Sequence, residues 1–268
     1  MENQPNSKIN QLLKNPSGAE SLEGIETSKL WGHLTSTWGM GERVIPKIMG
    51  DDSASQRIVE ISFRHYETAA RYVKGKRVLD IACGSGYGSQ MLRLAGASSV
   101  LGVDVCADTV QYAREHYQIP GIEFICADAE QFESSERFDV IVSYETIEHL
   151  HYPLRFLENL HKLLVPGGDF LLSVPLGETR HFDPYHLHAF SQQQVFTLLR
   201  TTGFLIDTYR CDDLFISRTE LSRLGERFPL SNPSIRDLFL TGRGWQTIYD
   251  FVCRGGFHIS DLLVVSRT

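Results

Sequence analysis

The chain has 268 residues, of which 42% are hydrophobic and 22% are charged, and it carries a net charge of −7. This composition is typical of a soluble globular protein, and the acidic balance argues against a broad nucleic-acid-binding surface. No apolar run approaches the roughly 18 residues that span a bilayer, and the first residues lack the pattern of a secretory signal. The five cysteines form no C-x-x-C pair, which indicates reduced thiols in a cytoplasm.

The N-terminal part of the chain, residues 1–54, is expected to be an extension or lid outside a main domain of residues 55–268. Residues 1–28 show little hydrophobic periodicity, and they fit a frayed terminus as well as a segment that orders over an active site. From Ser55 to Val73 the apolar residues recur with a period near 3.6, which predicts a helix that leads into a sheet.

The stretch VLDIACGSGYGS, Val78 to Ser89, predicts a buried strand, a glycine-rich loop and the start of a helix. This order is typical of the nucleotide-binding crevice in a doubly wound α/β sheet. The glycine spacing is G-x-G-x-G, whereas dinucleotide folds have G-x-G-x-x-G. Asp80 inside the strand would repel a pyrophosphate and attract a cation, so the pattern disfavours an NAD-dependent dehydrogenase.

The same string resembles motif I of the class I S-adenosylmethionine (SAM) methyltransferases. The resemblance implies that SAM is the methyl donor and that the strand and loop bind it through Asp80, Ala82, Gly84 and Gly86. The preceding helix resembles the lead-in of bacterial small-molecule and glycan methyltransferases, where that helix helps to enclose SAM. Arg64, His65 and Tyr66 are therefore candidate contacts, although an ordinary surface helix explains each of them equally well.

Two further acidic residues follow strands. Asp104 ends the strand predicted over Ser99–Asp104, about two dozen residues after Asp80, the interval expected for a carboxylate that binds a ribose. Val105 is expected to lie against the adenine. Asp128 and Ala129, after the strand predicted over Ile122–Cys126, resemble the family motif that meets the adenine, and Asp128 could equally cap the next turn.

The remaining elements complete a doubly wound, mostly parallel sheet, which the resemblance extends to seven strands with an N-terminal helical cap. Residues 211–256 are expected to be a largely helical insertion before the last strand, either a lid or a homodimer contact. The predicted elements are a helix Thr109–His116 capped by Asp108, a strand Phe138–Ser143, a helix Pro153–Leu164, a strand Phe170–Val174, a helix Gln192–Thr201, and strands Gly203–Tyr209 and His258–Val265.

The acceptor site is expected beyond the carboxyl end of the strand Phe138–Ser143, where Tyr144 would also contact the cofactor. Glu145, Glu148 and His149 form E-x-x-E-H, and on a helical turn these positions face the same way. His149, His186 and Glu145 are the candidate catalytic residues, because an imidazole titrates near neutral pH and can act as a base.

The E-x-x-E-H pattern resembles the ubiquinone-pathway O-methyltransferases and the RNA 2′-O-methyltransferases of small-RNA ends. In those families two glutamates, this histidine and a later histidine bind a divalent ion. The resemblance implies a Mg or Mn site at Glu145, Glu148, His149 and His186, while a plain histidine base remains the alternative.

The sequence therefore predicts a SAM-dependent methyltransferase acting on a hydroxyl, or less favourably an amine, of a small-molecule, secondary-metabolite or sugar acceptor. RNA 2′-O-methylation is the alternative among enzymes, and the acidic balance disfavours it. A non-catalytic SAM-binding subunit is the alternative from another class, disfavoured by the intact cofactor motifs.

Overall fold

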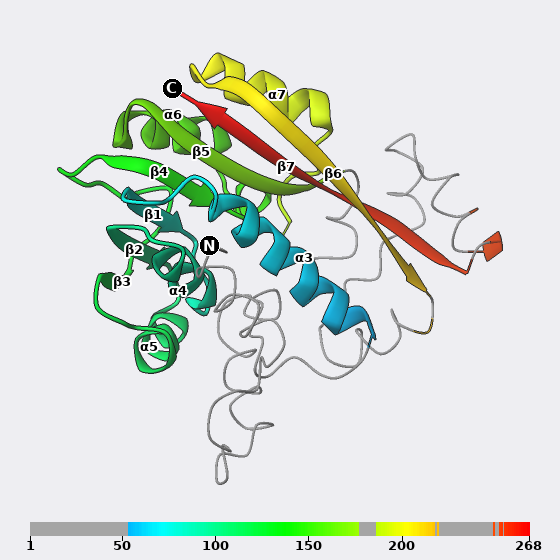
Figure 1. The fold of residues 1–268 in the computed structure, drawn as a ribbon. Coiled ribbons are helices and arrows are strands. Elements are labelled where there is room, and N and C mark those ends of the chain that lie inside the picture. The colour runs from blue at the N-terminus through cyan, green and yellow to red at the C-terminus, as the bar shows by residue number, and fades with distance from the viewer. Residues whose placement is uncertain (1–52, 177–185, 218, 220–248, 250–251, 254) are drawn as a thin grey trace, which may run out of the picture. The chain divides into compact units, whose positions relative to one another are not determined.

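The computed structural model describes residues 53–176, 186–217, 219, 249, 252–253 and 255–268 (Figure 1). Their strands form a seven-stranded sheet in the order β3-β2-β1-β4-β5-β7-β6. This order confirms the predicted doubly wound, mostly parallel α/β fold. The chain divides into two compact units, Met1–Val142 and Ser143–Thr268.

In the first unit a helix leads into four parallel strands, and β4 ends where the second unit begins. Its elements are α3 Ser53–Ala69, β1 Arg77–Ile81, α4 Tyr87–Leu94, β2 Ser99–Asp104, α5 Ala107–His116, β3 Ile122–Cys126 and β4 Phe138–Ser143. The strand β1 pairs in parallel with both β2 and β4, and β2 pairs in parallel with β3. Buried apolar runs form these strands because a parallel sheet is covered on both faces.

The helices α4 and α5 pack against the strands of this unit (Figure 1). Gly86, at the start of α4, allows a close approach to α5 and β3. A Cβ atom at Gly86 would lie 2.6 Å from the Cβ of Ala113 and 2.8 Å from the ring of Phe124. Gly86 also has φ 87°, in the left-handed region. Glycine is therefore required there both for its backbone conformation and for the packing of α4, α5 and β3.

In the second unit two helices accompany an antiparallel three-stranded ladder. Its elements are the 3₁₀ helix η2 Ile147–His149, α6 Pro153–Leu163, β5 Leu164–Leu176, α7 Gln192–Thr201, β6 Leu205–Ser217 and β7 Gly256–Arg267. The last strand, β7, runs antiparallel to both β5 and β6. Its segment from Leu262 to Val265 is buried, as expected for a strand with a neighbour on each side.

Several details differ from the elements expected from the sequence. The strand β5 runs from Leu164 to Leu176, whereas the sequence predicts a strand only over Phe170–Val174, after a helix that includes Leu164. The strand β6 continues to Ser217, so residues 211–217 belong to a strand and not to a helical insertion. The helix α5 begins at Ala107 with Cys106 at its N-cap, so Asp108 is in the first turn and the predicted Asp108 cap is wrong. Of the predicted N-terminal extension, residues 1–54, the last two belong to α3 and residues 1–52 lie outside the described residues, as does most of the remaining insertion.

Within the described ranges, no helix is long and apolar enough to cross a membrane.

Candidate active site

The glycine-rich loop between β1 and α4 contains several left-handed residues. Gly84 has φ 55° and Gly86 has φ 87°, as glycines readily do, and Ala82 has φ 62°. For a residue with a side chain this conformation costs roughly 1–2 kcal/mol. Such strain is found most often where backbone geometry serves a site, and Ala82 is one of the residues predicted to bind the cofactor.

The predicted ribose ligand, Asp104, is tied to this loop by backbone hydrogen bonds. Its Oδ2 accepts a hydrogen bond from the Gly84 N–H at 3.0 Å, and its Oδ1 accepts one from the Cys106 N–H at 2.9 Å. The Asp104 side chain lies at the end of β2 and the residue is only 3% exposed. The carboxylate thus joins the ends of β1 and β2, the position expected for a group that binds a ribose.

Asp80 lies on β1 and is buried, with 1% of its surface exposed. Ser89 Oγ donates to its Oδ2 at 2.6 Å, and the Tyr66 hydroxyl donates to its Oδ1 at 3.2 Å. Burial raises the pKa of Asp80, the hydrogen bonds from Ser89 and Tyr66 lower it, and the negative charge of Asp104 raises it; together they move it from 3.8 to about 7. A cationic ligand would favour the ionised carboxylate.

The residues predicted to meet the adenine are exposed to different degrees. Val105 is 58% exposed, a large exposed fraction for a valine, and an apolar base could cover it. Asp128 Oδ1 accepts a hydrogen bond from the Glu130 N–H at 2.9 Å, so the alternative capping role of Asp128 is present. Ala129 is buried beside it. The adenine contacts of these three residues stay predictions.

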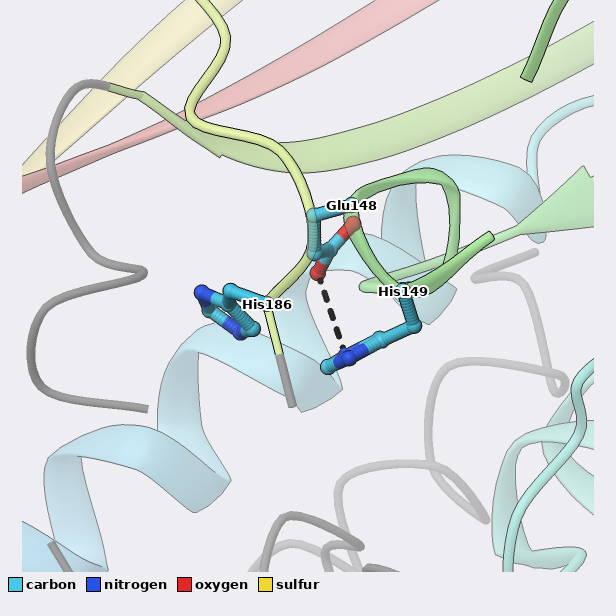
Figure 2. A group of neighbouring side chains, drawn as sticks. All are labelled: Glu148, His149 and His186. Carbon is cyan, nitrogen blue, oxygen red and sulfur yellow. Dashed lines mark ion pairs between the residues drawn. The ribbon is translucent and has the colours of Figure 1, made fainter. Parts of the chain in front are cut away.

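In the second unit, Glu148, His149 and His186 lie close together, and Figure 2 shows Glu148 and His149 facing each other. One potential ligand atom from each lies within 4.8 Å of the other two. The His149 Nε2 is 3.6 Å from Glu148 Oε1, and the rings of His149 and His186 meet edge to face at 4.7 Å. His186 therefore meets the adjacent Glu148 and His149 from a part of the chain nearly forty residues away, and two imidazoles and a carboxylate gather in one place.

The carboxyl group of Glu148 is unusual for a buried polar group. The residue is 1% exposed, and neither side-chain oxygen has a hydrogen-bond partner among the described residues. Burial raises the pKa of Glu148, nearby backbone N–H groups lower it and the negative charge of Asp261 raises it, so that together they move it from 4.5 to about 8. Besides the 3.6 Å contact with His149, this buried carboxyl group lacks a side-chain hydrogen bond within the part of the chain that the structure describes, so it is suited to a ligand that supplies further contacts.

Backbone hydrogen bonds hold the segment that contains His186 next to Glu148. The N–H groups of Leu187 and His188 donate to the Glu148 carbonyl at 2.9 Å and 3.1 Å. The His188 ring contacts the Leu150 carbonyl through Nε2 at 2.8 Å. Burial lowers the pKa of His186 from 6.5 to about 3, and His149 lowers it further, so His186 is neutral at physiological pH. A neutral imidazole can accept a proton or bind a cation.

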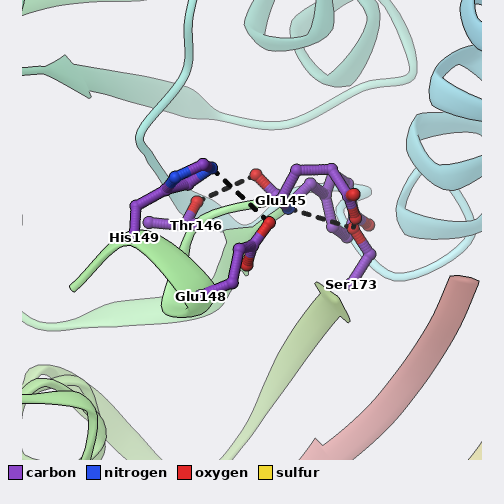
Figure 3. A network of polar contacts seen from close by, with 6 residues as sticks. Glu145, Thr146, Glu148, His149 and Ser173 are labelled. Carbon is purple, nitrogen blue, oxygen red and sulfur yellow. Dashed lines mark hydrogen bonds and ion pairs between the residues drawn. The ribbon is translucent and has the colours of Figure 1, made fainter. Parts of the chain in front are cut away.

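Glu145 lies outside this group of three (Figure 3). It has φ 47° and precedes η2, so it is not on the same helical turn as Glu148 and His149. Its N–H donates to the Ser173 carbonyl and to Ser173 Oγ, and the Ser173 hydroxyl donates to its carboxylate. Its role as a metal ligand or catalytic residue stays a prediction.

A carboxylate of β7 adds to this region, and sequence reasoning missed it. Burial raises the pKa of Glu145 well above its usual range, and the charges of Asp261 and Glu148 raise it further. Glu145 keeps an exposed surface, so burial acts on it less than on the fully buried Glu148. Asp261 and Ser173 belong to no motif. Ser173 contacts Glu145 from β5, and the pairing of β5 with β7 places Asp261 opposite Pro175, two residues along from Ser173.

Tyr144, predicted to contact the cofactor, is partly buried, and its carbonyl accepts a hydrogen bond from Thr146 Oγ1 at 2.8 Å.

The fold is that of the class I, Rossmann-like SAM-dependent methyltransferases. It has their sheet order, their glycine-rich loop after β1 and their acidic residues near the ends of β1 and β2.

Comparison with known proteins agrees with this class. Residues 79–172 match the family model of a methyltransferase domain, Methyltransf_11. The ubiquinone biosynthesis O-methyltransferase of Coxiella burnetii is 35% identical over 130 residues, which are 47% of this chain and 54% of that protein. The mitochondrial enzyme of the same name from Arabidopsis thaliana is 35% identical over 175 residues, 62% of this chain and 54% of that protein.

These matches span about half the length of each relative. Among solved structures, the N-methyltransferase NodS from Bradyrhizobium japonicum, in complex with S-adenosylhomocysteine, is similar with a TM-score of 0.55. It is 15% identical, covering 91% of this chain and 99% of NodS, and so it supports the fold alone. Residues 79–172 are therefore similar to the methyltransferase domain, and the chain is similar to SAM-dependent methyltransferases in sequence and in fold.

Proposed function

We propose that the protein transfers a methyl group from SAM to a hydroxyl group of a small-molecule or sugar acceptor. The observation that carries the proposal is the buried Glu148 carboxyl group, without a described hydrogen-bond partner, beside the imidazoles of His149 and His186. The family match and the ubiquinone O-methyltransferase relatives support methyl transfer to oxygen.

The first unit would bind the donor. Asp104 would accept hydrogen bonds from the ribose hydroxyls, and Asp80 would attract the cationic methionine end of SAM. The strained loop, with Ala82 in the left-handed region, would let the cofactor approach the backbone between these two carboxylates. Val105, whose side chain is exposed, would cover the adenine.

The reaction is a displacement at carbon. A lone pair of the acceptor oxygen forms the new O–C bond while the S–C bond breaks, and the sulfonium becomes the neutral thioether of S-adenosylhomocysteine. The hydroxyl proton must pass to a base, and the imidazole of His186 is one candidate, although its lowered pKa makes it a weaker base than an ordinary histidine. His149 is the second candidate base, in edge-to-face contact with His186.

The same residues fit a divalent cation. Glu148 would supply a carboxylate oxygen, and His149 and His186 would supply nitrogens, a donor set that suits Mn and tolerates Mg. Such an ion, when bound, supplies positive charge that favours the ionised form of an acceptor hydroxyl. It would also satisfy the Glu148 oxygens, which have no hydrogen-bond partner among the described residues.

A transfer assay with radiolabelled SAM tests the proposal on a panel of phenols, sugars, amines and RNA 3′ ends, with and without EDTA. Label should appear on a phenol or sugar, and Glu148→Gln should lower the rate by at least about a hundredfold. The exposed Glu158 of α6 offers a matched control, and Glu158→Gln should keep the parent rate. Label on amines alone or on RNA alone would overturn the acceptor assignment, and SAM binding without transfer to any acceptor would favour a non-catalytic subunit.

The metal is tested in the same assay. EDTA should abolish the transfer, and Mn or Mg should restore it. Elemental analysis should then find less bound Mn in Glu148→Gln than in the parent protein. Transfer that is indifferent to EDTA would reject the metal and leave His149 or His186 as the base.

A further inference from the structure

We propose that Tyr66 and Ser89 are positioning residues of the cofactor site, and that they orient the Asp80 carboxylate which receives the cationic amino-acid end of SAM. The inference rests on the proposed use of SAM and goes beyond it, because Tyr66 lies outside the glycine-rich string and Ser89, the last residue of that string, has no role assigned to it there. Both act through Asp80 and need not touch the cofactor themselves.

The geometry holds the Asp80 carboxylate from two helices. The Ser89 hydroxyl, from the first turn of α4, donates to Oδ2 at 2.6 Å. The Tyr66 hydroxyl, from α3, lies 3.2 Å from Oδ1 and 3.4 Å from Oδ2. Asp80 itself is on β1, so three elements of the first unit meet at one carboxylate. Two donors from different directions restrict the rotation of the carboxylate plane.

Packing restrains both donors. A Cβ atom at Gly88 would overlap with the ring of Tyr66, so glycine at this position of α4 leaves the space that the ring fills. The ring of Tyr87 meets Tyr66 edge-on at 5.4 Å and lies 5.2 Å from Phe63. Ser89 is fully buried. Neither hydroxyl can turn toward solvent without disturbing this packing, so both donors are preorganised.

The two hydroxyl groups also influence the charge of Asp80. Burial and the nearby Asp104 carboxylate disfavour the ionised form of Asp80, whereas the hydrogen bonds from Ser89 and Tyr66 favour it. Without these donors a larger fraction of Asp80 would carry a proton at neutral pH. A cationic ligand would then have to displace that proton, and its affinity would fall.

The test measures binding and needs no methyl acceptor. Titration calorimetry compares the parent protein with Tyr66→Phe and Ser89→Ala, using SAM, S-adenosylhomocysteine and methylthioadenosine as ligands. Methylthioadenosine shares the adenosine half of SAM and lacks the amino-acid end. We expect about fivefold weaker binding of SAM and S-adenosylhomocysteine in Tyr66→Phe and about tenfold in Ser89→Ala, the size of one ordinary hydrogen bond, because each donor acts on the cofactor only through Asp80.

Methylthioadenosine should bind both variants within about twofold of the parent protein, because it does not reach Asp80. A role in folding alone would instead weaken all three ligands together or none of them. Tyr66→Phe keeps the ring and hence the packing against Gly88, so this variant should remain folded. The buried Tyr112 of α5 supplies a matched control, and Tyr112→Phe should bind all three ligands as the parent does.

A double-mutant cycle completes the test. If Tyr66 acts through Asp80, then Tyr66→Phe should have no further effect on SAM affinity in a protein that already carries Asp80→Asn. Equal losses in both backgrounds, or unchanged SAM affinity in Tyr66→Phe and Ser89→Ala, would overturn the inference while leaving the proposed function intact. Failure of the parent protein to bind SAM would reject both.

Discussion

Replacing Asp80 by asparagine should flatten the pH dependence of the stability of the ligand-free protein. Burial raises the pKa of Asp80 from 3.8 to about 7 in the folded state. The folded protein therefore holds a proton that the unfolded chain releases at lower pH. The stabilisation from this proton is complete below the unfolded pKa and is lost as the pH rises through the folded pKa.

Between about pH 5 and pH 8 the loss of free energy of unfolding amounts to about 3 kcal/mol for this single group. Urea denaturation at the two pH values measures it in the parent protein and in Asp80→Asn, without SAM. The difference between the two pH slopes isolates Asp80, because the other titrating groups are common to both proteins. We expect the variant to lose about 3 kcal/mol less than the parent.

Asp207 provides the control, because its carboxylate forms an ion pair with Arg267 at 3.0 Å in which both side chains are about half exposed. Asp207→Asn should leave the pH slope unchanged, since solvent screens such pairs. If Asp80→Asn and the parent protein lose the same stability between the two pH values, Asp80 does not titrate in this range and the reasoning about its burial is refuted.

Three further changes test other parts of the structure. Gly88→Ala should lower the free energy of unfolding by roughly 1–3 kcal/mol, because the added methyl group overlaps with the ring of Tyr66; an unchanged urea midpoint would contradict this packing. Asp104→Ala should weaken SAM binding by at least about a hundredfold in calorimetry, because it removes the proposed ribose acceptor and the hydrogen-bond partner of the Gly84 amide. Retained affinity would show that the ribose binds elsewhere. Ser191→Ala should cost about 1 kcal/mol in thermal unfolding because it removes the capping box of α7, whereas Thr at this position should retain most of the stability.

The parallel strands of the first unit were predictable from the sequence because burial on both faces leaves an apolar run with clear ends. The strands at Ser99–Asp104, Ile122–Cys126 and Phe138–Ser143 have the predicted bounds. In the second unit the ends of the strands were less predictable, above all the end of β6. Residues 211–217 include charged and exposed side chains, and their strand character comes from pairing with β7 rather than from an apolar pattern.

The residues of the candidate site that belong to sequence motifs were predictable, whereas those placed by strand pairing or by local backbone conformation were not. His186 was identified through a family resemblance, and the structure brings it to Glu148 and His149. The expectation that Glu145 shares their turn assumed helical backbone from residue 145 to 149, and the left-handed conformation of Glu145 removes that periodicity. Asp261 could not be found in the sequence, because its importance depends on a pairing between strands far apart along the chain.

The attachment of His186 through backbone amides has a consequence for engineering the acceptor specificity. The N–H groups of residues 187 and 188 hold this segment on the Glu148 carbonyl, and such bonds do not depend on the identity of the side chains. Leu187 is 43% exposed, so a library at this position could vary the shape of the surface beside His186. Only proline, which lacks the N–H, should be excluded from such a library, which makes residue 187 a favourable starting point for directed evolution toward new acceptors.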